Sequence, residues 1–306
     1  MSIWSKGKVA LPYRVLSSVD RAATYGRPTR RKLPPPILLL GDFFDTLHAW
    51  EAVVQPIVRR SETCTVVLVN LPGQAGTSWP QDKVMTNQLV AKILLDFVAD
   101  LVKDKVLLTD DLRLVGVGNG AHVAMCMAVV KKPCGPMLLI NPFTAVSPHL
   151  GLVLRTWQSA MADLGAAAAN EAAFLCMYSH LYFSDRFLAS VSLADATNAA
   201  LAVKNGISLA GKQAIVAGVL ASDPVDAAAV PGPLIVVVAE DDTLVPPLAA
   251  KDGAFGEARP KIDDMIESAA ADDGIYVECW PCGHAIGVER KADLGTLLED
   301  FSKLQL

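Results

Sequence analysis

Short, almost purely apolar runs alternate along the chain with longer segments in which apolar residues recur at helical spacing. The runs have the length of buried strands, and the periodic segments are typical of amphipathic helices. We expect strands at Pro36–Leu40, Thr65–Leu71, Leu112–Val117, Pro136–Ile140, Leu234–Val238 and Tyr276–Trp280. We expect helices at Ala49–Arg59, Lys83–Lys103, Ala121–Lys131, Lys261–Ala270 and Ala292–Leu304. Strands that are apolar on both faces and alternate with helices indicate an α/β fold. The expected sheet is mostly parallel, has about eight strands and is covered by helices on both faces.

The pattern changes in the middle of the chain, which becomes Ala-rich and helical and carries no strand signal. An insertion of this kind between two strands predicts a helical cap over residues 146–231. Residues 36–145 and 232–306 then form the core, and residues 1–35 form an N-terminal arm. The chain is therefore expected to be one capped domain with an arm rather than two domains.

The arm of residues 1–35 is basic, with eight Lys and Arg residues against a single acid, Asp20. A terminal segment with few apolar anchors is seldom ordered unless something holds it. The whole chain has 52% hydrophobic and only 19% charged residues, whereas about 25% charged residues is typical. We therefore expect other protein subunits to contact the arm and the cap.

Composition also argues against several classes of protein. No stretch approaches the roughly 18 apolar residues of a membrane-spanning helix, so no membrane span is expected. A net charge of −5 argues against a nucleic-acid partner. No apolar signal segment opens the chain, which favours an intracellular, reducing compartment. The cytoplasm, including the cytoskeleton or a cilium, is the first expectation, and the Arg-rich arm makes the mitochondrion the alternative.

Two of the six cysteines, Cys279 and Cys282, have the spacing of a redox motif, and His284 follows them closely. A thioredoxin-like motif would follow an early strand, and this one lies near the end of the chain. A zinc ion bound by these three residues would lack an obvious fourth ligand. We therefore expect the cysteines to be core residues, with no metal and no cofactor.

The most informative stretch is a glycine-rich turn between an expected strand and an expected helix, Gly116-Val117-Gly118-Asn119-Gly120. Its spacing matches the nucleophile elbow Gly-x-Ser-x-Gly. Gly118 stands in the nucleophile position, has no side chain and cannot form an acyl-enzyme. The Gly-x-Gly-x-x-Gly spacing of a dinucleotide site is absent, so nucleotide binding is disfavoured.

The sequence resembles the α/β-hydrolase family over nearly all of residues 35–306. The resemblance rests on a strand with its oxyanion loop, a turn, an acid-bearing loop and a Gly-His pair, at Pro36–Trp50, Asn70–Ser78, Ala239–Pro246 and Gly283-His284. The elbow, the acid and the histidine follow one another in the family's order. The resemblance implies the hydrolase fold, with Asp242 as the acid of a catalytic triad and His284 as its base.

The departures from the family lie where the chemistry would occur. Gly118 replaces the nucleophile, and the His-Gly pair before the family's oxyanion loop is Gly41-Asp42 here. A carboxylate at Asp42 would repel the charge that an oxyanion hole stabilises, unless it points away. We therefore expect no catalytic residue. The degenerate positions are the triad positions Gly118, Asp242 and His284 and the oxyanion-loop positions Gly41, Asp42, Phe43 and Asn119.

The elbow is also similar to that of the N-myc downstream-regulated family, which has the hydrolase fold without an elbow serine and is regarded as non-enzymatic. The leading hypothesis is a non-catalytic α/β-hydrolase-like protein that serves as a structural or scaffolding subunit of a larger assembly. The alternative is a lyase, oxygenase or hydrolase that depends on His284 and Asp242 and acts on a small apolar substrate, because a His–Asp pair can serve as a general base. A second alternative is a small-molecule receptor that uses a pocket beneath the cap.

Overall fold

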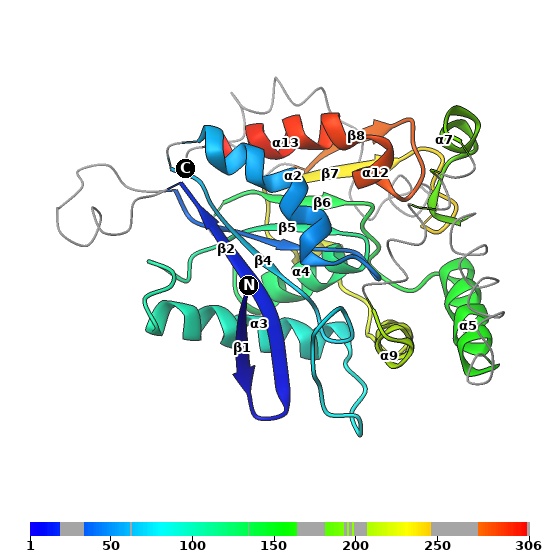
Figure 1. Ribbon diagram of the computed structural model, residues 1–306, viewed down its shortest axis with the longest axis horizontal. Coiled ribbons are helices and arrows are strands. Elements are labelled where there is room, and N and C mark those ends of the chain that lie inside the picture. The colour runs from blue at the N-terminus through cyan, green and yellow to red at the C-terminus, as the bar shows by residue number, and fades with distance from the viewer. Residues whose placement is uncertain are drawn as a thin grey trace.

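The structure is a computed structural model that describes residues 1–18, 34–61, 63–133, 135–163, 181–192, 195, 198, 207–245 and 275–304. Its centre is one eight-stranded sheet with the strand order β1-β2-β4-β3-β5-β6-β7-β8 (Figure 1). The strands are β1 (Ser2–Lys6), β2 (Val9–Ser17), β3 (Ile37–Leu40), β4 (Thr65–Val69), β5 (Arg113–Val117), β6 (Met137–Ile140), β7 (Leu234–Ala239) and β8 (Ile275–Trp280). From β4 to β8 all neighbours are parallel. The predicted α/β fold with a mostly parallel sheet is confirmed.

Two layers of helices cover the sheet. The core helices are α2 (Leu47–Arg60), α3 (Asn87–Lys103), α4 (Asn119–Val130), α12 (Ile286–Glu289) and α13 (Lys291–Lys303). Helices α3 and α4 pack on one face of the sheet, and α2, α12 and α13 pack on the other. The strands are buried on both faces, which explains their continuous apolar sequence. The expected helix at Lys261–Ala270 lies outside the described residues.

The first seventeen residues differ from the expected arm because they form two strands of the sheet. Strand β1 pairs antiparallel with β2, and β2 pairs antiparallel with β4. Trp4 and Leu11 are buried in the core, and the Trp4 indole N–H donates to Asp100 on α3. Lysines on an edge strand discourage pairing with another chain, so the basic character of this segment suits a sheet edge. For these residues the sheet supplies the order that a protein partner was expected to supply.

The described helices between β6 and β7, where the cap was expected and for which we keep that name, include α5 (Pro148–Asp163), α7 (Asp185–Ser190), α9 (Leu209–Leu220) and the short 3₁₀ helix η2 (Ala227–Ala229). Helices α5, α7 and α9 lie toward the right of Figure 1, with α7 above the other two, and α5 and α9 pack against each other. Their apolar cluster includes Trp157, whose ring contacts Phe43 and Phe44 of the loop after β3. The cap helices therefore hold this loop in place by burying its two phenylalanines. Among the described residues, no helix is both long and apolar enough to cross a membrane.

Candidate active site

The glycine-rich turn has the geometry of an elbow, because β5 ends at Val117 and α4 begins at Asn119, with Gly118 between them. Gly118 has a φ of +51°, a conformation that side chains with a Cβ rarely adopt. A Cβ on Gly118 would lie 2.0 Å from Oδ1 of Asp42. The space that a nucleophile side chain would use is therefore filled by the carboxylate of Asp42.

Three donors hold the buried Asp42 carboxylate. Its Oδ1 accepts a hydrogen bond from the backbone N–H of Asn119 at 2.8 Å. Its Oδ2 accepts hydrogen bonds from the Tyr182 hydroxyl at 2.6 Å and from Nε2 of His284 at 2.9 Å. Burial by itself would raise the pKa of Asp42, but the charge of His284 and these hydrogen bonds hold it below its ordinary value. The carboxylate is therefore ionised at neutral pH.

His284 connects Asp42 to the second aspartate, Asp242. Its Nδ1 lies 2.6 Å from Oδ2 of Asp242, whose Oδ1 accepts from the backbone N–H groups of Leu244 and Val245. Burial disfavours the charged imidazole, but the charges and hydrogen bonds of both aspartates outweigh burial and raise the pKa of His284 to about 10. The site therefore holds an imidazolium between two carboxylates at neutral pH.

The turn that follows β4 fixes the loop after β3 through hydrogen bonds. Gln74 donates from its side-chain amide to the backbone oxygen of Asp42 at 2.7 Å, and its own amide oxygen accepts from the Leu71 N–H. Asn70 accepts from the Leu47 N–H at the start of α2. Buried side-chain bonds to a loop backbone fix that loop because an unpaired partner would be costly. This turn, part of the family resemblance, thus positions Asp42.

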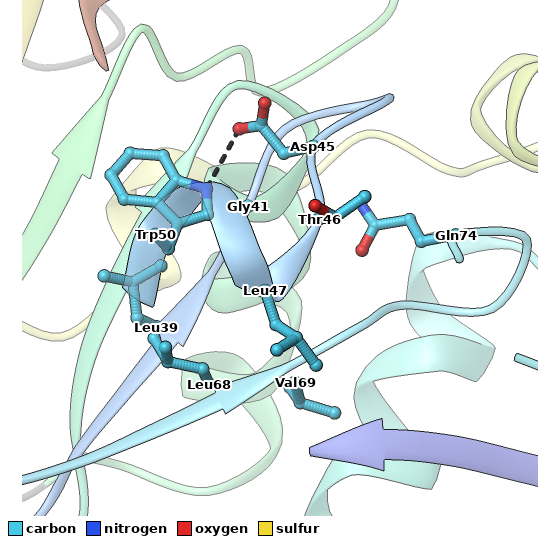
Figure 2. A pocket seen from close by; sticks show the side chains of 9 residues that line it. All are labelled: Leu39, Gly41, Asp45, Thr46, Leu47, Trp50, Leu68, Val69 and Gln74. Atoms are coloured by element: carbon cyan, nitrogen blue, oxygen red, sulfur yellow. Dashed lines mark hydrogen bonds between the residues drawn. The ribbon is translucent and has the colours of Figure 1, made fainter. Parts of the chain in front are cut away.

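A small cavity adjoins the same loop (Figure 2). Asp45 and Trp50 meet in it, and the Trp50 indole N–H donates to Oδ2 of Asp45 at 3.0 Å. The same Oδ2 accepts from the Asp42 backbone N–H at 3.1 Å. A Cβ on Gly41 would come within 2.8 Å of the Trp50 ring nitrogen, so glycine is required there for this pair to form.

A larger cavity of about 110 Å³ lies over the carboxylate–imidazolium pair, between α2, α12 and the cap residues Tyr182 and Phe183. Its polar side chains other than the Trp50 indole are Asp42, Asp45, Tyr182 and His284. Most of the rest of its lining is apolar, including Val53, Val117, Phe183, Ile286 and Val288. Such a space suits a small apolar ligand whose reacting atoms face a few polar groups.

A second polar network lies behind the elbow. The Asn119 side-chain oxygen accepts from Asn87 on α3, and Asn87 also contacts the imidazole of His122 at 2.8 Å. His122 is buried and stacks on Phe143. Burial lowers the pKa of His122 to about 4, so this imidazole is neutral. The network fixes Asn119, whose N–H holds Asp42.

The two cysteines of the Cys279-Trp280-Pro281-Cys282 segment lie in β8 and shortly after it. Cys279 and Cys282 are both free thiols. Burial raises the pKa of Cys282 to about 12, which makes it a poor thiolate. In the described part of the chain, no group of three or more His, Cys, Asp or Glu side chains is arranged to hold a metal ion.

Asp45 and Tyr182 are two groups of the site that the sequence did not predict. Tyr182 lies in the Ala-rich cap, where nothing marks one aromatic residue as facing the elbow. Asp45 had a usable signal, because Gly41-Asp42-Phe43-Phe44-Asp45 carries two acids around two apolar residues directly after a buried strand. Tyr182 reaches the site through its bond to Asp42, 140 residues away along the chain, whereas Asp45 is held by its neighbours Asp42 and Trp50.

Residues 37–293 match the sequence model of the alpha/beta hydrolase family. With this match over most of its length and with the fold described above, the chain belongs to that family. Comparison with curated protein sequences finds no match. The similarity of the elbow to the N-myc downstream-regulated family stays a prediction.

Several solved structures share the fold at low sequence identity. An alpha/beta hydrolase enzyme, MGS-M2, from a Medee basin deep-sea metagenome library is 17% identical with a TM-score of 0.73, over 100% of this chain and 98% of that one. The enol-lactonase from Burkholderia xenovorans is 13% identical with a TM-score of 0.68, over 98% and 99%. The bromoperoxidase from Bacillus anthracis is 14% identical with a TM-score of 0.68, over 96% of each chain.

These findings correct the expectation that the chain is not an enzyme. The structural neighbours are hydrolases, esterases, an enol-lactonase and bromoperoxidases. That expectation treated Gly118 and Asp42 as two independent losses. In the structure they form one arrangement, because the missing side chain of Gly118 makes room for the carboxylate of Asp42. The sequence predicted that the Asp42 carboxylate would repel an oxyanion unless it pointed away from the site. In the structure it points into the site, beside a cationic His284.

Proposed function

We propose that the protein is a hydrolase that opens small apolar epoxides, with the Asp42 carboxylate as its nucleophile. The observation that carries the proposal is the position of this carboxylate, in the space beside Gly118 and in contact with His284. A carboxylate can attack carbon to form an ester that water then cleaves. The proposal keeps the dependence on His284 and Asp242 that the sequence suggests, and it adds the nucleophile that the elbow lacks.

In the first step, Oδ2 of Asp42 attacks a carbon of the epoxide, so that a C–O bond forms and a C–O bond of the ring breaks. The released oxygen takes the proton from Nε2 of His284, which leaves an alkyl ester and a neutral imidazole. In the resting site the Tyr182 hydroxyl donates to the carboxylate oxygen that attacks. It can donate to the epoxide oxygen instead and stabilise the charge that develops there.

In the second step, water attacks Cγ of the ester while the neutral imidazole of His284 takes one of its protons. Negative charge develops on Oδ1, to which the Asn119 N–H already donates. The carbonyl then re-forms, the bond to the alkyl oxygen breaks, and the proton of the new hydroxyl passes to that oxygen. The diol leaves, and the Asp42 carboxylate and the His284 imidazolium are restored.

The charge of His284 favours an epoxide over other substrates. Because its pKa is raised to about 10, His284 is protonated in the resting site, so it can act there as an acid and not as a base. An epoxide oxygen needs that proton when the ring opens, whereas a departing halide does not. Esterification of Asp42 removes one of the two charges that raise the pKa of His284, so the imidazole becomes a base for the second step. The apolar cavity of about 110 Å³ limits the substrate to a small molecule.

A single turnover in ¹⁸O-water, with enzyme in excess over styrene oxide, tests the proposal. We expect unlabelled diol in the first turnover and ¹⁸O in the peptide that contains Asp42, because the added oxygen comes from the carboxylate. Asp42→Asn should form no ester and lose turnover by about a thousandfold or more. Asp241→Asn, at an exposed neighbour of the triad acid, is the control and should keep the wild-type rate.

Two results would count against the proposal. Labelled diol in the first turnover would mean that water attacks the substrate directly. No turnover of styrene oxide or of smaller alkyl epoxides by the wild-type protein would remove the reaction altogether.

A further inference from the structure

Asp45 has an unusual place in the apolar cavity. It lines the larger cavity together with Asp42 and His284, and it also lines the small cavity of Figure 2. The other carboxylate, the phenol and the imidazole of the larger cavity are bonded to one another. Asp45 takes no part in that cluster of side chains, and its half-buried carboxylate remains as a polar group in an apolar lining.

The orientation of the Asp45 carboxylate is fixed by two donors on one of its oxygens. Oδ2 accepts from the backbone N–H of Asp42 and from the Trp50 indole N–H, at 3.1 and 3.0 Å. In the described part of the chain, Oδ1 has no hydrogen-bond partner. A water molecule in an apolar cavity needs polar partners to be held there, and Asp45, whose Oδ1 can accept a hydrogen bond, lines the same cavity as Asp42 and His284.

We propose that Asp45 binds the water that cleaves the ester on Asp42. This inference rests on the proposed function. The water donates one hydrogen bond to Oδ1 of Asp45 and gives its other proton to neutral His284 as its oxygen bonds to Cγ of Asp42. Asp45 is thus a catalytic residue of the second step alone, and it leaves the first step to Asp42, His284 and Tyr182.

The charges around Asp45 support a role in the second step alone. Burial and then the charge of Asp42 raise the pKa of Asp45 to about 6, while the two hydrogen bonds on Oδ2 and the charge of His284 act in the opposite direction. Trp50 on α2 and Gln74 below the loop carry no charge, and the Tyr182 phenol is bonded to Asp42. Once Asp42 is esterified its charge is gone, so Asp45 ionises more readily when the water is needed.

The test measures the two steps separately with styrene oxide and the full-length protein. Asp45→Asn keeps the size of the side chain, and its amide oxygen can still accept from Trp50 and the Asp42 N–H. It then presents an NH₂ group, a donor, where the water needs an acceptor. We expect the rate of ester formation, followed by rapid quench and mass spectrometry, to change less than threefold. Ester hydrolysis should slow at least tenfold, so that the Asp42 adduct accumulates.

Two further variants keep the result interpretable. Thr46→Ala alters the next residue of the loop, which lines the small cavity alone, and it should leave both rates unchanged. Trp50→Phe removes one of the two donors on Oδ2 but leaves the Asp45 charge, and it should slow hydrolysis alone by a smaller factor. In the wild type, the rate of ester hydrolysis should increase with pH as Asp45 ionises, at a pKa below the value of about 6 that it has beside a charged Asp42. Asp45→Asn should lack this increase. The change in rate caused by the ionisation of His284 should be present in both proteins.

The outcomes separate the inference from the proposed function. If Asp45→Asn forms and hydrolyses the adduct at wild-type rates, the role of Asp45 is wrong and the nucleophilic role of Asp42 stands. If the first step slows as much as the second, Asp45 is a structural support and the inference is again wrong. If the wild type forms no adduct, the proposed function itself fails.

Discussion

At the scale of single residues, Gly118 and Asp42 form one exchange: the nucleophile position has lost its side chain, and the carboxylate of Asp42 occupies that space. A serine at position 118 would collide with the carboxylate, because even its Cβ would lie 2.0 Å from Oδ1 of Asp42. A glycine at position 42 would leave the Asn119 N–H without its acceptor and His284 without its second carboxylate. Each of the two residues is therefore explained only by the other.

The exchange predicts a strong coupling between the two positions. Gly118→Ser alone should lower the free energy of unfolding by about 2 kcal/mol or more, through the positive φ and the overlap with Asp42. The double variant Gly118→Ser/Asp42→Gly removes the overlap and should be more stable than the sum of the single variants predicts, by about 0.5–3 kcal/mol. Urea denaturation of the four proteins measures this coupling.

A chemical readout accompanies the stability measurement. The wild-type protein has no hydroxyl at the elbow, so a serine-directed fluorophosphonate should not label it there. The double variant should be labelled at the serine introduced at position 118. Additive single-variant effects, or labelling of the wild type at its elbow, would contradict the exchange.

At the scale of secondary-structure elements, the N-terminal hairpin of β1 and β2 extends the sheet by two strands. Trp4 joins this hairpin to α3: its indole N–H donates to Asp100 at 3.1 Å, and its ring packs edge-to-face on Phe97. Its neighbour Ile3 points the other way and is 63% exposed. Alternate residues of the strand thus have opposite roles.

This alternation predicts unequal effects of two neighbouring substitutions. Trp4→Ala should lower the free energy of unfolding by about 3 kcal/mol, because it empties a buried site and removes the bond to Asp100. Ile3→Ala, the matched control on the exposed face, should change it by less than about 0.5 kcal/mol. Urea denaturation followed by circular dichroism compares the two. Equal small effects would mean that the hairpin is not part of the cooperative fold.

At the scale of the whole molecule, His284 joins three segments that are far apart in the sequence. Its two ring nitrogens bind Asp42 after β3 and Asp242 after β7, and Tyr182 of the cap shares the Asp42 oxygen. The pKa of His284 is raised from 6.5 to about 10. The charged imidazole therefore holds the core loops and the cap together, and its protonation is linked to global stability.

The sign of this linkage gives a prediction for stability against pH. Below the pKa of an unfolded histidine, near 6.5, both states bind the proton and the full contribution of His284 is present. Between about pH 6.5 and 10 only the folded state binds it, so the free energy of unfolding should fall as pH rises. Urea denaturation from pH 6 to 10 measures the fall.

The contribution of Asp42 runs the other way. Its pKa is lowered in the folded state, so that contribution is present above the ordinary carboxylate value and is lost in acid. In Asp42→Asn the fall between pH 6.5 and 10 should be smaller, because one of the two charges that raise the pKa of His284 is gone. The same fall in both proteins would show that Asp42 does not hold the proton on His284.

Much of the fold could be predicted from the sequence because it rests on local patterns. Strands such as Leu234–Ala239 are apolar on both faces, and a long helix such as Asn87–Lys103 repeats its apolar face at helical spacing. The acid and the histidine of the site follow from motif order, and the bond between Asp242 and His284 agrees with that expectation. The N-terminal strands were missed because the basic charge of residues 1–35 pointed instead to an arm that a protein partner holds.

The sequence by itself determined the parallel sheet, its helical layers and the two residues Asp242 and His284, because strand periodicity and motif spacing are properties of neighbouring residues. The tertiary structure alone decided what stands in the place of the nucleophile. The contact between Asp42 and the Gly118-Asn119 turn joins two loops 77 residues apart, and the direction of the Asp42 side chain depends on how Phe43 and Phe44 are buried under Trp157. Packing between distant elements sets this direction. The sequence therefore shows Gly118 only as a missing nucleophile, whereas the fold shows that it leaves space for the Asp42 carboxylate.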